Sequence, residues 1–199
     1  MNKDILICGV GGQGTVLASK IIASAAMSEG NTVHSAETIG MAQRGGSVTS
    51  HVRIGDSAFS PLIPNGSADL ILAFEPAEAV RNLRYLKKDG IAVVNTAPTK
   101  PVTESLSETG YDGREAIDFL KQNCDSIFVS SDEMSREFGS SKFFNIILIG
   151  IAAGSGKLGL GRETIINQLK ALVPERFIDI NLRAFEKGYE TGKNSVEGD

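Results

Sequence analysis

The feature that most constrains the fold is a short apolar strand that runs into a glycine-rich turn and then into a helix. The apolar run covers residues 5–8, the turn reads Gly-Val-Gly-Gly-Gln-Gly over residues 9–14, and apolar residues recur at helical spacing over 13–29. A continuous apolar run that ends in glycine is typical of a strand buried on both faces of a sheet. With a second strand expected at 32–36, the segment predicts a right-handed parallel unit.

The alternation of strands and helices continues along the chain. Further strands are expected at 47–54, 69–74, 90–95 and 126–130, and helices at 75–86, 114–123, 131–138, 143–153, 162–173 and 182–189. This order predicts an α/β fold: a three-layer Rossmann-like domain with a mostly parallel sheet and a helical C-terminal part. A single domain is expected over residues 1–190, with a frayed polar tail over 191–199.

Two stretches depart from this alternation. Residues 47–54 alternate between apolar and polar, which predicts a half-exposed strand. A Gly-Asp turn follows and leads into residues 59–63, a pattern compatible with an edge hairpin. Residues 96–113 are rich in Thr, Pro, Ser and Gly and are expected to form the longest irregular connection.

Composition excludes several functional classes. The net charge of −4 offers no basic stripe for nucleic acid. No run of about 18 apolar residues predicts a membrane span, and no signal peptide is recognisable at the N-terminus. Cys8 and Cys124 are far apart in the sequence, whereas an iron–sulfur cluster takes about four thiolates. Two such cysteines do not predict a disulfide framework either, so a reducing cytoplasm is the expected location.

The first glycine turn is a candidate cofactor-binding site. Its residues are Gly9, Gly11, Gly12, Gln13 and Gly14. Glycines permit close approach of a ligand to the backbone, and the following helix N-terminus attracts a phosphate. Gln13 adds an amide that a purely structural turn would not need, and Glu37 follows where a ribose-binding acid would lie. The alternative is that the glycines only let strand and helix pack closely.

A second glycine-rich turn is a candidate partner-facing or ligand-facing loop. Its residues are Gln43, Arg44, Gly45 and Gly46. The Arg44 guanidinium suits a carboxylate or a phosphate, and the glycines allow another chain or a ligand to approach. The alternative is a solvated entry to a hairpin. A standard dinucleotide-binding domain has no use for this loop.

Isolated polar residues give weaker signals. His51 and Arg53 share one face of a strand, where a partly exposed structural histidine is favoured over a catalytic one, and His34 is expected to be buried and structural. Glu75 suits either a ligand site at a strand end or the first turn of a helix. Asn145 is either a satisfied buried amide or an interface contact. No metal-ligand spacing and no nucleophile motif is recognisable, so the catalytic residues stay unassigned.

Several motifs together resemble one family. They are Gly-Val-Gly-Gly-Gln-Gly at 9–14, Gly-Met-Ala-Gln-Arg-Gly-Gly-Ser-Val at 40–48, Ser-His-Val-Arg-Ile-Gly at 50–55 and Ala-Asp-Leu-Ile-Leu-Ala-Phe-Glu-Pro at 68–76. The combination resembles the gamma-type subunit of 2-oxoacid:ferredoxin oxidoreductases, almost end to end. Within that family, residues 41–48 and the short length are most similar to the small (beta) subunits of indolepyruvate ferredoxin oxidoreductases.

The resemblance implies a role without a catalytic centre of the chain's own. Such complexes oxidatively decarboxylate a 2-oxoacid to an acyl-CoA, with thiamine diphosphate and iron–sulfur clusters on the partner subunit. The implied partners are the large alpha subunit and, indirectly, ferredoxin, and the chain is implied to help place coenzyme A or cover the active site. A contact between residues 11–14 and coenzyme A is a hypothesis built on the anion-binding geometry of the turn. Two other hypotheses remain at this point: a stand-alone NAD-binding Rossmann dehydrogenase and a nucleotide-binding module.

Overall fold

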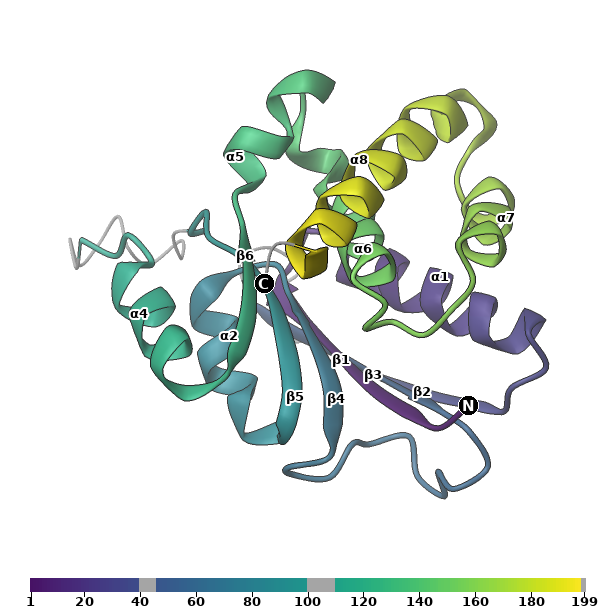
Figure 1. Ribbon diagram of the computed structural model, residues 1–199, viewed down its shortest axis with the longest axis horizontal. Coiled ribbons are helices and arrows are strands. Elements are labelled where there is room, and N and C mark those ends of the chain that lie inside the picture. The colour runs from purple at the N-terminus through teal and green to yellow at the C-terminus, as the bar shows by residue number, and fades with distance from the viewer. Residues whose placement is uncertain (40–45, 100–109, 198–199) are drawn as a thin grey trace.

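The computed structural model describes residues 1–39, 46–99 and 110–197 of the chain. A six-stranded sheet with strand order β2-β3-β1-β4-β5-β6 lies between two sets of helices (Figure 1). The strands are β1 (Lys3–Val10), β2 (Val33–Ile39), β3 (Ser47–Ile54), β4 (Ala68–Ala73), β5 (Leu86–Asn95) and β6 (Asp125–Val129). The main helices are α1 (Thr15–Ser28), α2 (Pro76–Asn82), α4 (Arg114–Asn123), α5 (Ser131–Met134), α6 (Phe144–Gly154), α7 (Arg162–Leu172) and α8 (Ile178–Glu197).

Strand β1 is buried on both faces, as the sequence predicts. Ile5 and Ile7 belong to the core beneath α1 and α6, whereas Leu6 and Cys8 belong to a second core beneath α2 and α4. Successive side chains of a strand point to opposite faces, so one apolar run supplies both cores. The predicted three-layer α/β architecture with a mostly parallel sheet is confirmed.

The pairing at one edge of the sheet differs from the prediction. Strands β1, β4, β5 and β6 are parallel, but β3 pairs antiparallel with both β1 and β2. β1 and β2 thus run in the same direction without being neighbours, because β3 lies between them. The edge hairpin consists of β2 and β3, and residues 59–63 form no strand. The prediction placed the hairpin one segment too late, since an alternating pattern does not identify the partner strand.

The internal position of β3 also corrects its expected half-exposure. Val52 and Ile54 lie in the core beneath α1, and His51, on the other face, is only 4% exposed. His34 lies on the edge strand β2 and is half-buried rather than buried. Both histidine predictions therefore had the exposure wrong, because the order of the strands decides which strand lies at the edge.

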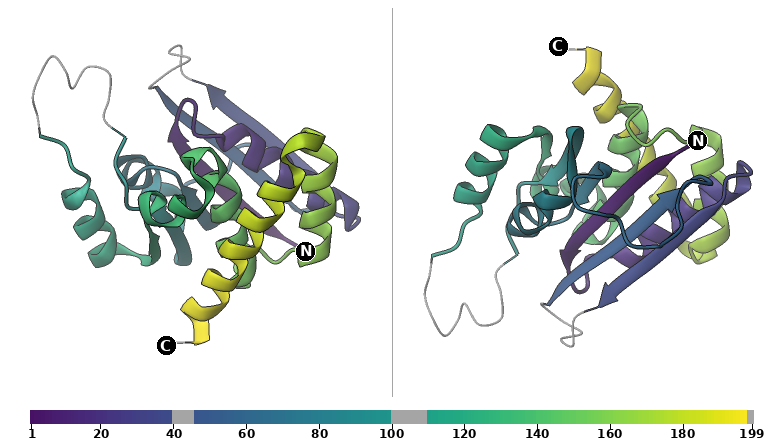
Figure 2. Two further views of the ribbon diagram at one scale, coloured as in Figure 1. Left: turned by 90° about the horizontal axis from the view of Figure 1, so that it is seen from above. Right: turned by 90° about the horizontal axis from the view of Figure 1, so that it is seen from below.

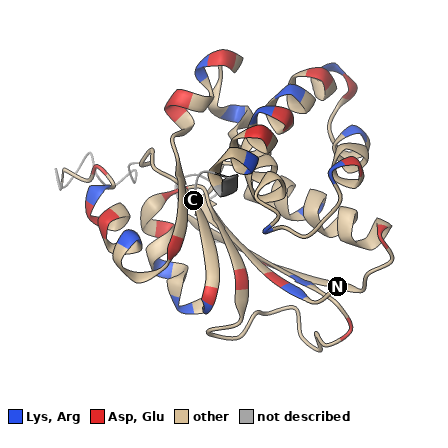
Figure 3. Cartoon of the chain, in the orientation of Figure 1, with Lys and Arg blue, Asp and Glu red and all other residues tan. Residues whose placement is uncertain are grey.

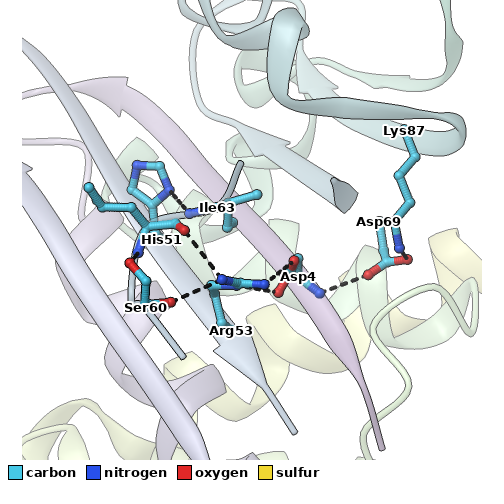
Figure 4. A network of polar contacts seen from close by, with 8 residues as sticks. Asp4, His51, Arg53, Ser60, Ile63, Asp69 and Lys87 are labelled. Carbon is cyan, nitrogen blue, oxygen red and sulfur yellow. Dashed lines mark hydrogen bonds and ion pairs between the residues drawn. The ribbon is translucent and has the colours of Figure 1, made fainter. Parts of the chain in front are cut away.

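The connection from β3 to β4 covers part of the sheet face that the helices leave open, as the view from below shows (Figure 2). Arg53 holds this connection at one point. Its guanidinium pairs with both carboxylate oxygens of Asp4 at 2.9 and 3.1 Å and donates to the Ser60 carbonyl at 3.0 Å (Figure 4). His51 Nδ1 accepts a hydrogen bond from the Ile63 N–H at 3.2 Å. These contacts give Arg53 and His51 structural roles.

We expect His51 to make the protein less stable in mild acid. Burial, and then the charge of Arg53, lowers the pKa of His51 below its usual value. A histidine with a lowered pKa takes up a proton more readily in the unfolded chain, so its contribution is complete above pH about 6.5 and is lost as pH falls toward the folded pKa. Urea unfolding at pH 7.5 and 5.5 should show a larger loss of stability for the wild type than for His51→Gln. Equal losses in the two proteins would contradict this assignment.

The C-terminal helix is longer than its predicted range of 182–189. α8 continues to Glu197 because it packs along α6, and Gly192 still lies against the backbone of Ile151. In the part of the chain that the structure describes, no helix has both the length and the apolar character that a bilayer span requires.

Candidate functional site

The first glycine turn lies where β1 ends and α1 begins. Gly12 and Gly14 have φ values of +102° and +84°, a region that L side chains rarely adopt. The Gly11 N–H donates to the Gly46 carbonyl at 2.9 Å. The structure thus brings the first turn into contact with the end of the second, whereas Gln43, Arg44 and Gly45 lie outside the described residues.

Gln13 holds the turn in place. Its Oε1 accepts from the Val10 N–H at 2.7 Å, and its Nε2 donates to the Phe74 carbonyl at 3.1 Å and to Thr99 Oγ1 at 3.0 Å. The amide therefore joins the ends of β1 and β4 to the segment after β5. The expectation that the turn itself would not need this amide is wrong.

A cavity of about 320 Å³ opens beside the turn. It lies at the carboxyl ends of β4 and β5, next to the N-termini of α1, α5 and α6. Its lining includes Gly12, Gln13 and Gly14 of the turn, Phe74 and Asn95 at the ends of β4 and β5, and Ser131 and Lys142. Ligands of open α/β sheets bind at this edge, and the first turn of a helix offers N–H groups without intrahelical partners.

Asn95 is a residue of this site that sequence reasoning missed. Its Nδ2 donates to the Phe74 carbonyl at 2.9 Å, and its Oδ1 accepts from the N–H groups of Ala97 and Ser131 at 3.1 and 2.9 Å. The side chain is 4% exposed and fixes the start of α5 against β5. The available signal was an asparagine at the end of a buried strand, where a polar side chain needs partners.

Charges around the cavity are few and of both signs. Lys142 and Asp132 line it, and both are exposed. Elsewhere, basic and acidic residues are interspersed along α4, α7 and α8 (Figure 3). The N-terminus of α1 adds a partial positive charge close to the cavity. The site accordingly favours an uncharged or anionic group over a cation.

Glu75 lies in a second, smaller recess of about 200 Å³, next to Ser47 and Tyr111. The Glu75 side chain caps α2 by accepting from the Glu78 N–H at 3.0 Å, and it also accepts from the Tyr111 hydroxyl. Burial, and then this hydrogen bond, raises the pKa of Tyr111. Ser47 donates to the Glu78 carboxylate at 2.6 Å. Of the two interpretations for Glu75, the structure supports a role at the start of the helix.

Glu37 does not reach the position of a ribose-binding acid. Because β3 lies between β2 and β1, Glu37 is about 5 Å, one strand spacing, farther from the strand that leads into the turn than it would be on a neighbouring strand. Its Oε1 accepts from the Ser19 hydroxyl on α1 at 3.1 Å. This arrangement disfavours the dinucleotide interpretation of the first turn.

Comparison with known proteins gives one family. The description of the matching family is "Pyruvate ferredoxin/flavodoxin oxidoreductase", and residues 4–191 match. The chain is 38% identical to indolepyruvate oxidoreductase subunit IorB of Archaeoglobus fulgidus, over 95% of this chain and 94% of that protein.

Solved structures agree at the level of the fold. The gamma subunit of a keto/oxoacid ferredoxin oxidoreductase from Geobacter sulfurreducens superimposes with a TM-score of 0.70 at 23% identity, over 96% of this chain and 98% of that chain. The 2-oxoglutarate:ferredoxin oxidoreductase from Magnetococcus marinus, a structure with 2-oxoglutarate, coenzyme A and succinyl-CoA bound, gives a TM-score of 0.75 at 19% identity. It covers 97% of this chain but 31% of that longer one.

Proposed function

Because the chain belongs to the pyruvate ferredoxin/flavodoxin oxidoreductase family, we propose that it is the small accessory subunit of an indolepyruvate ferredoxin oxidoreductase. The complex oxidatively decarboxylates an arylpyruvate to an acyl-CoA. The observation that carries the proposal is the end-to-end similarity to an indolepyruvate oxidoreductase subunit. Residues 1–190 act as one domain in this proposal.

The residues present argue for a division of labour between subunits. The two thiols of this chain, buried Cys8 and half-buried Cys124, do not fit a cluster that needs about four thiolates. In the described ranges no group of three or more His, Cys, Asp or Glu side chains suits a metal ion. We therefore assign thiamine diphosphate and the clusters to a large alpha subunit, which passes electrons to ferredoxin. The free thiols support a cytoplasmic location for this hetero-oligomer.

The cavity beside the first turn is the proposed contact for coenzyme A. The left-handed glycines keep side chains away from the turn, and the N-terminus of α1 supplies N–H donors for a phosphate. The long neighbour structure contains coenzyme A. This chain's own contribution is to bind and orient the coenzyme at the edge of the partner's active site.

Calorimetric titration of coenzyme A tests this role. We expect binding to the complex purified with its large subunit, and loss of that binding in Gly12→Val, because valine is strained at φ +102°. NAD titrated into the chain alone should give no heat of binding. Absence of coenzyme A binding to both the isolated chain and the wild-type complex, together with full activity of the Gly12→Val complex, would contradict the proposal. NAD retained by the isolated chain would support the dehydrogenase alternative instead.

A further inference from the structure

We propose that the uncovered face of β2 and β3, together with two apolar side chains of the β3–β4 connection, is the surface on which the large subunit docks. The inference rests on the proposed function, because it names where the proposed partner binds. This open face consists of His34, Ala36 and Thr38 on β2, Thr49 on β3, and Phe59 and Leu62 of the connection.

Half of one sheet face carries no helical layer in the described ranges. On the side to which Leu6 projects, α2 packs over β1, β4 and β5, and α4 packs over β6. Ala36 of β2 pairs with His51 of β3, which pairs in turn with Leu6 of β1. Residues directly opposite one another project to the same side of a sheet, so β2 and β3 extend this face beyond the helices (Figure 2). Because α/β domains ordinarily have layers on both faces, the uncovered half suits a layer that another chain supplies.

The strand residues of the open face are small and carry no carboxylate, ammonium or guanidinium group. Thr38 is exposed, and Ala36 and Thr49 are half-buried. The nearest charged side chain on β3, that of Arg53, is paired with both carboxylate oxygens of Asp4. The cores of protein interfaces are similarly depleted in charge. Burial against another protein therefore costs this face little desolvation.

Phe59 is the most exposed of the large apolar side chains that the structure describes. It is 95% exposed, and Leu62, three residues further on, is 54% exposed. The other exposed large apolar side chains are spread over the N-terminus, α1, α4, the end of α7 and the segment before α8. A single exposed apolar residue is ordinary. Two on one short segment, beside an uncovered sheet face, indicate an interaction site.

The backbone that carries these two side chains is held against the sheet. Arg53 donates to the carbonyls of Ser60 and Leu62 at 3.0 and 3.4 Å, and His51 accepts from the Ile63 N–H at 3.2 Å (Figure 4). An aromatic anchor on a backbone that is already fixed loses little conformational entropy on binding. Such anchors supply most of the binding energy of an interface.

The length of related chains identifies the occupant as the large subunit. This chain corresponds to 31% of the Magnetococcus marinus chain, and to 37% of ketoisovalerate oxidoreductase subunit VorA of Methanothermobacter marburgensis, to which it is 27% identical over 98% of its length. In those longer chains the domain is covalently joined to the rest of the subunit. In the proposed complex the large subunit is a separate chain, so non-covalent contact must replace that link.

The open face also lies in the right place for this partner. The pairing of β1 with β3 ends at Val10 and Ser47, directly beside the glycine turn. A subunit that covers β2 and β3 therefore extends to the end of the sheet at which the cavity opens. Docking on this face would bring the partner's active site and the cavity together.

The dissociation constant between the two subunits tests the surface. It is measured by diluting the co-expressed complex and following it by fluorescence-detected sedimentation. We expect Phe59→Ala to raise the dissociation constant about 30-fold, as for an aromatic hot spot. Thr38→Arg should raise it at least about tenfold, because the interface would bury an unpaired charge.

Two matched controls should leave the dissociation constant unchanged. Phe119→Ala removes a phenylalanine that is 46% exposed on α4, away from the open face. Ser35→Arg places the same charge at an exposed position of β2 that projects to the opposite side of the sheet, since Ser35 pairs with the core residue Val52. Circular dichroism checks that each variant is folded.

The outcomes separate this inference from the proposed function. An unchanged dissociation constant in both Phe59→Ala and Thr38→Arg, or an equal weakening in the controls, overturns the docking surface. The proposed function then stands if the complex oxidises an arylpyruvate. An effect of Phe59→Ala that is confined to self-association of the chain alone also overturns it, because the occupant is then a second copy. A complex that depends on Phe59 and Thr38 but oxidises no arylpyruvate supports the surface and removes the proposed reaction.

Discussion

Replacing Gly188 by alanine should destabilise the protein by about 3 kcal/mol, the upper end of the usual cost of overpacking. Alanine in place of glycine inside a helix ordinarily stabilises it by about 1 kcal/mol, so the expected sign is reversed. The reason is the contact between α6 and α8. A Cβ on Gly188 would lie less than 3.0 Å from the Ile147 carbonyl oxygen, and one on Gly154 equally close to the Tyr189 carbonyl oxygen.

Four glycines allow this close contact, two on each helix: Gly150, Gly154, Gly188 and Gly192. Since the obstructing atoms belong to backbone, a side chain at these positions must push the helices apart and loosen the core between them. Glu190→Ala, an exposed position of the same helix, is the control and should change stability little. The measurement is chemical unfolding monitored by circular dichroism. A Gly188→Ala protein as stable as the wild type would show that the two helices can separate at no cost.

Replacing Gly14 by alanine should destabilise the fold and also abolish ligand binding at the cavity. Two costs combine at this position. At φ +84° an L residue is strained by roughly 1–2 kcal/mol, and the new Cβ would approach Asn145 Nδ2 to 2.6 Å. Asn145 must move, so the amide leaves the position from which it faces the turn. We expect a total loss of about 3 kcal/mol and no measurable binding of coenzyme A to the complex.

Gly12→Ala separates strain from collision. Gly12 also has a left-handed φ, of +102°, but a Cβ there meets nothing within 4 Å. This variant should lose only the strain cost. Truncation of the side chain in Gly14→Ala/Asn145→Ala removes the collision and should restore part of the stability. Equal losses in Gly12→Ala and Gly14→Ala would indicate that the contact with Asn145 has no energetic weight.

Local pattern predicted most of the elements but not their pairing. The ranges predicted for β3 and α4 match the structure, because burial periodicity and turn residues lie within those segments. The order of the strands depends on contacts between segments far apart in the chain. Hence β3 was not expected between β1 and β2. His51 was expected to be partly exposed, whereas it is buried.

The site divides in a similar way. The sequence identified the turn of residues 9–14, since glycine spacing after a buried strand is a local signal. Asn95, Ser131 and Lys142 carry no such signal, because each belongs to a different element and is related to the turn only by the fold. Asn145 was noticed, but its role depends on the backbone of Gly14, which a sequence does not place.

The sequence by itself determined the α/β class, the glycine turn and the family, since these depend on residue types at short spacing. Only the tertiary structure decided that the turn meets Gly46, that Gln13 is used to hold the turn, and that the Asn145 side chain lies against Gly14. The physical reason is that hydrogen-bond satisfaction is a property of three-dimensional neighbours. A polar side chain reveals whether it is structural or ligand-binding only once every partner within reach is known.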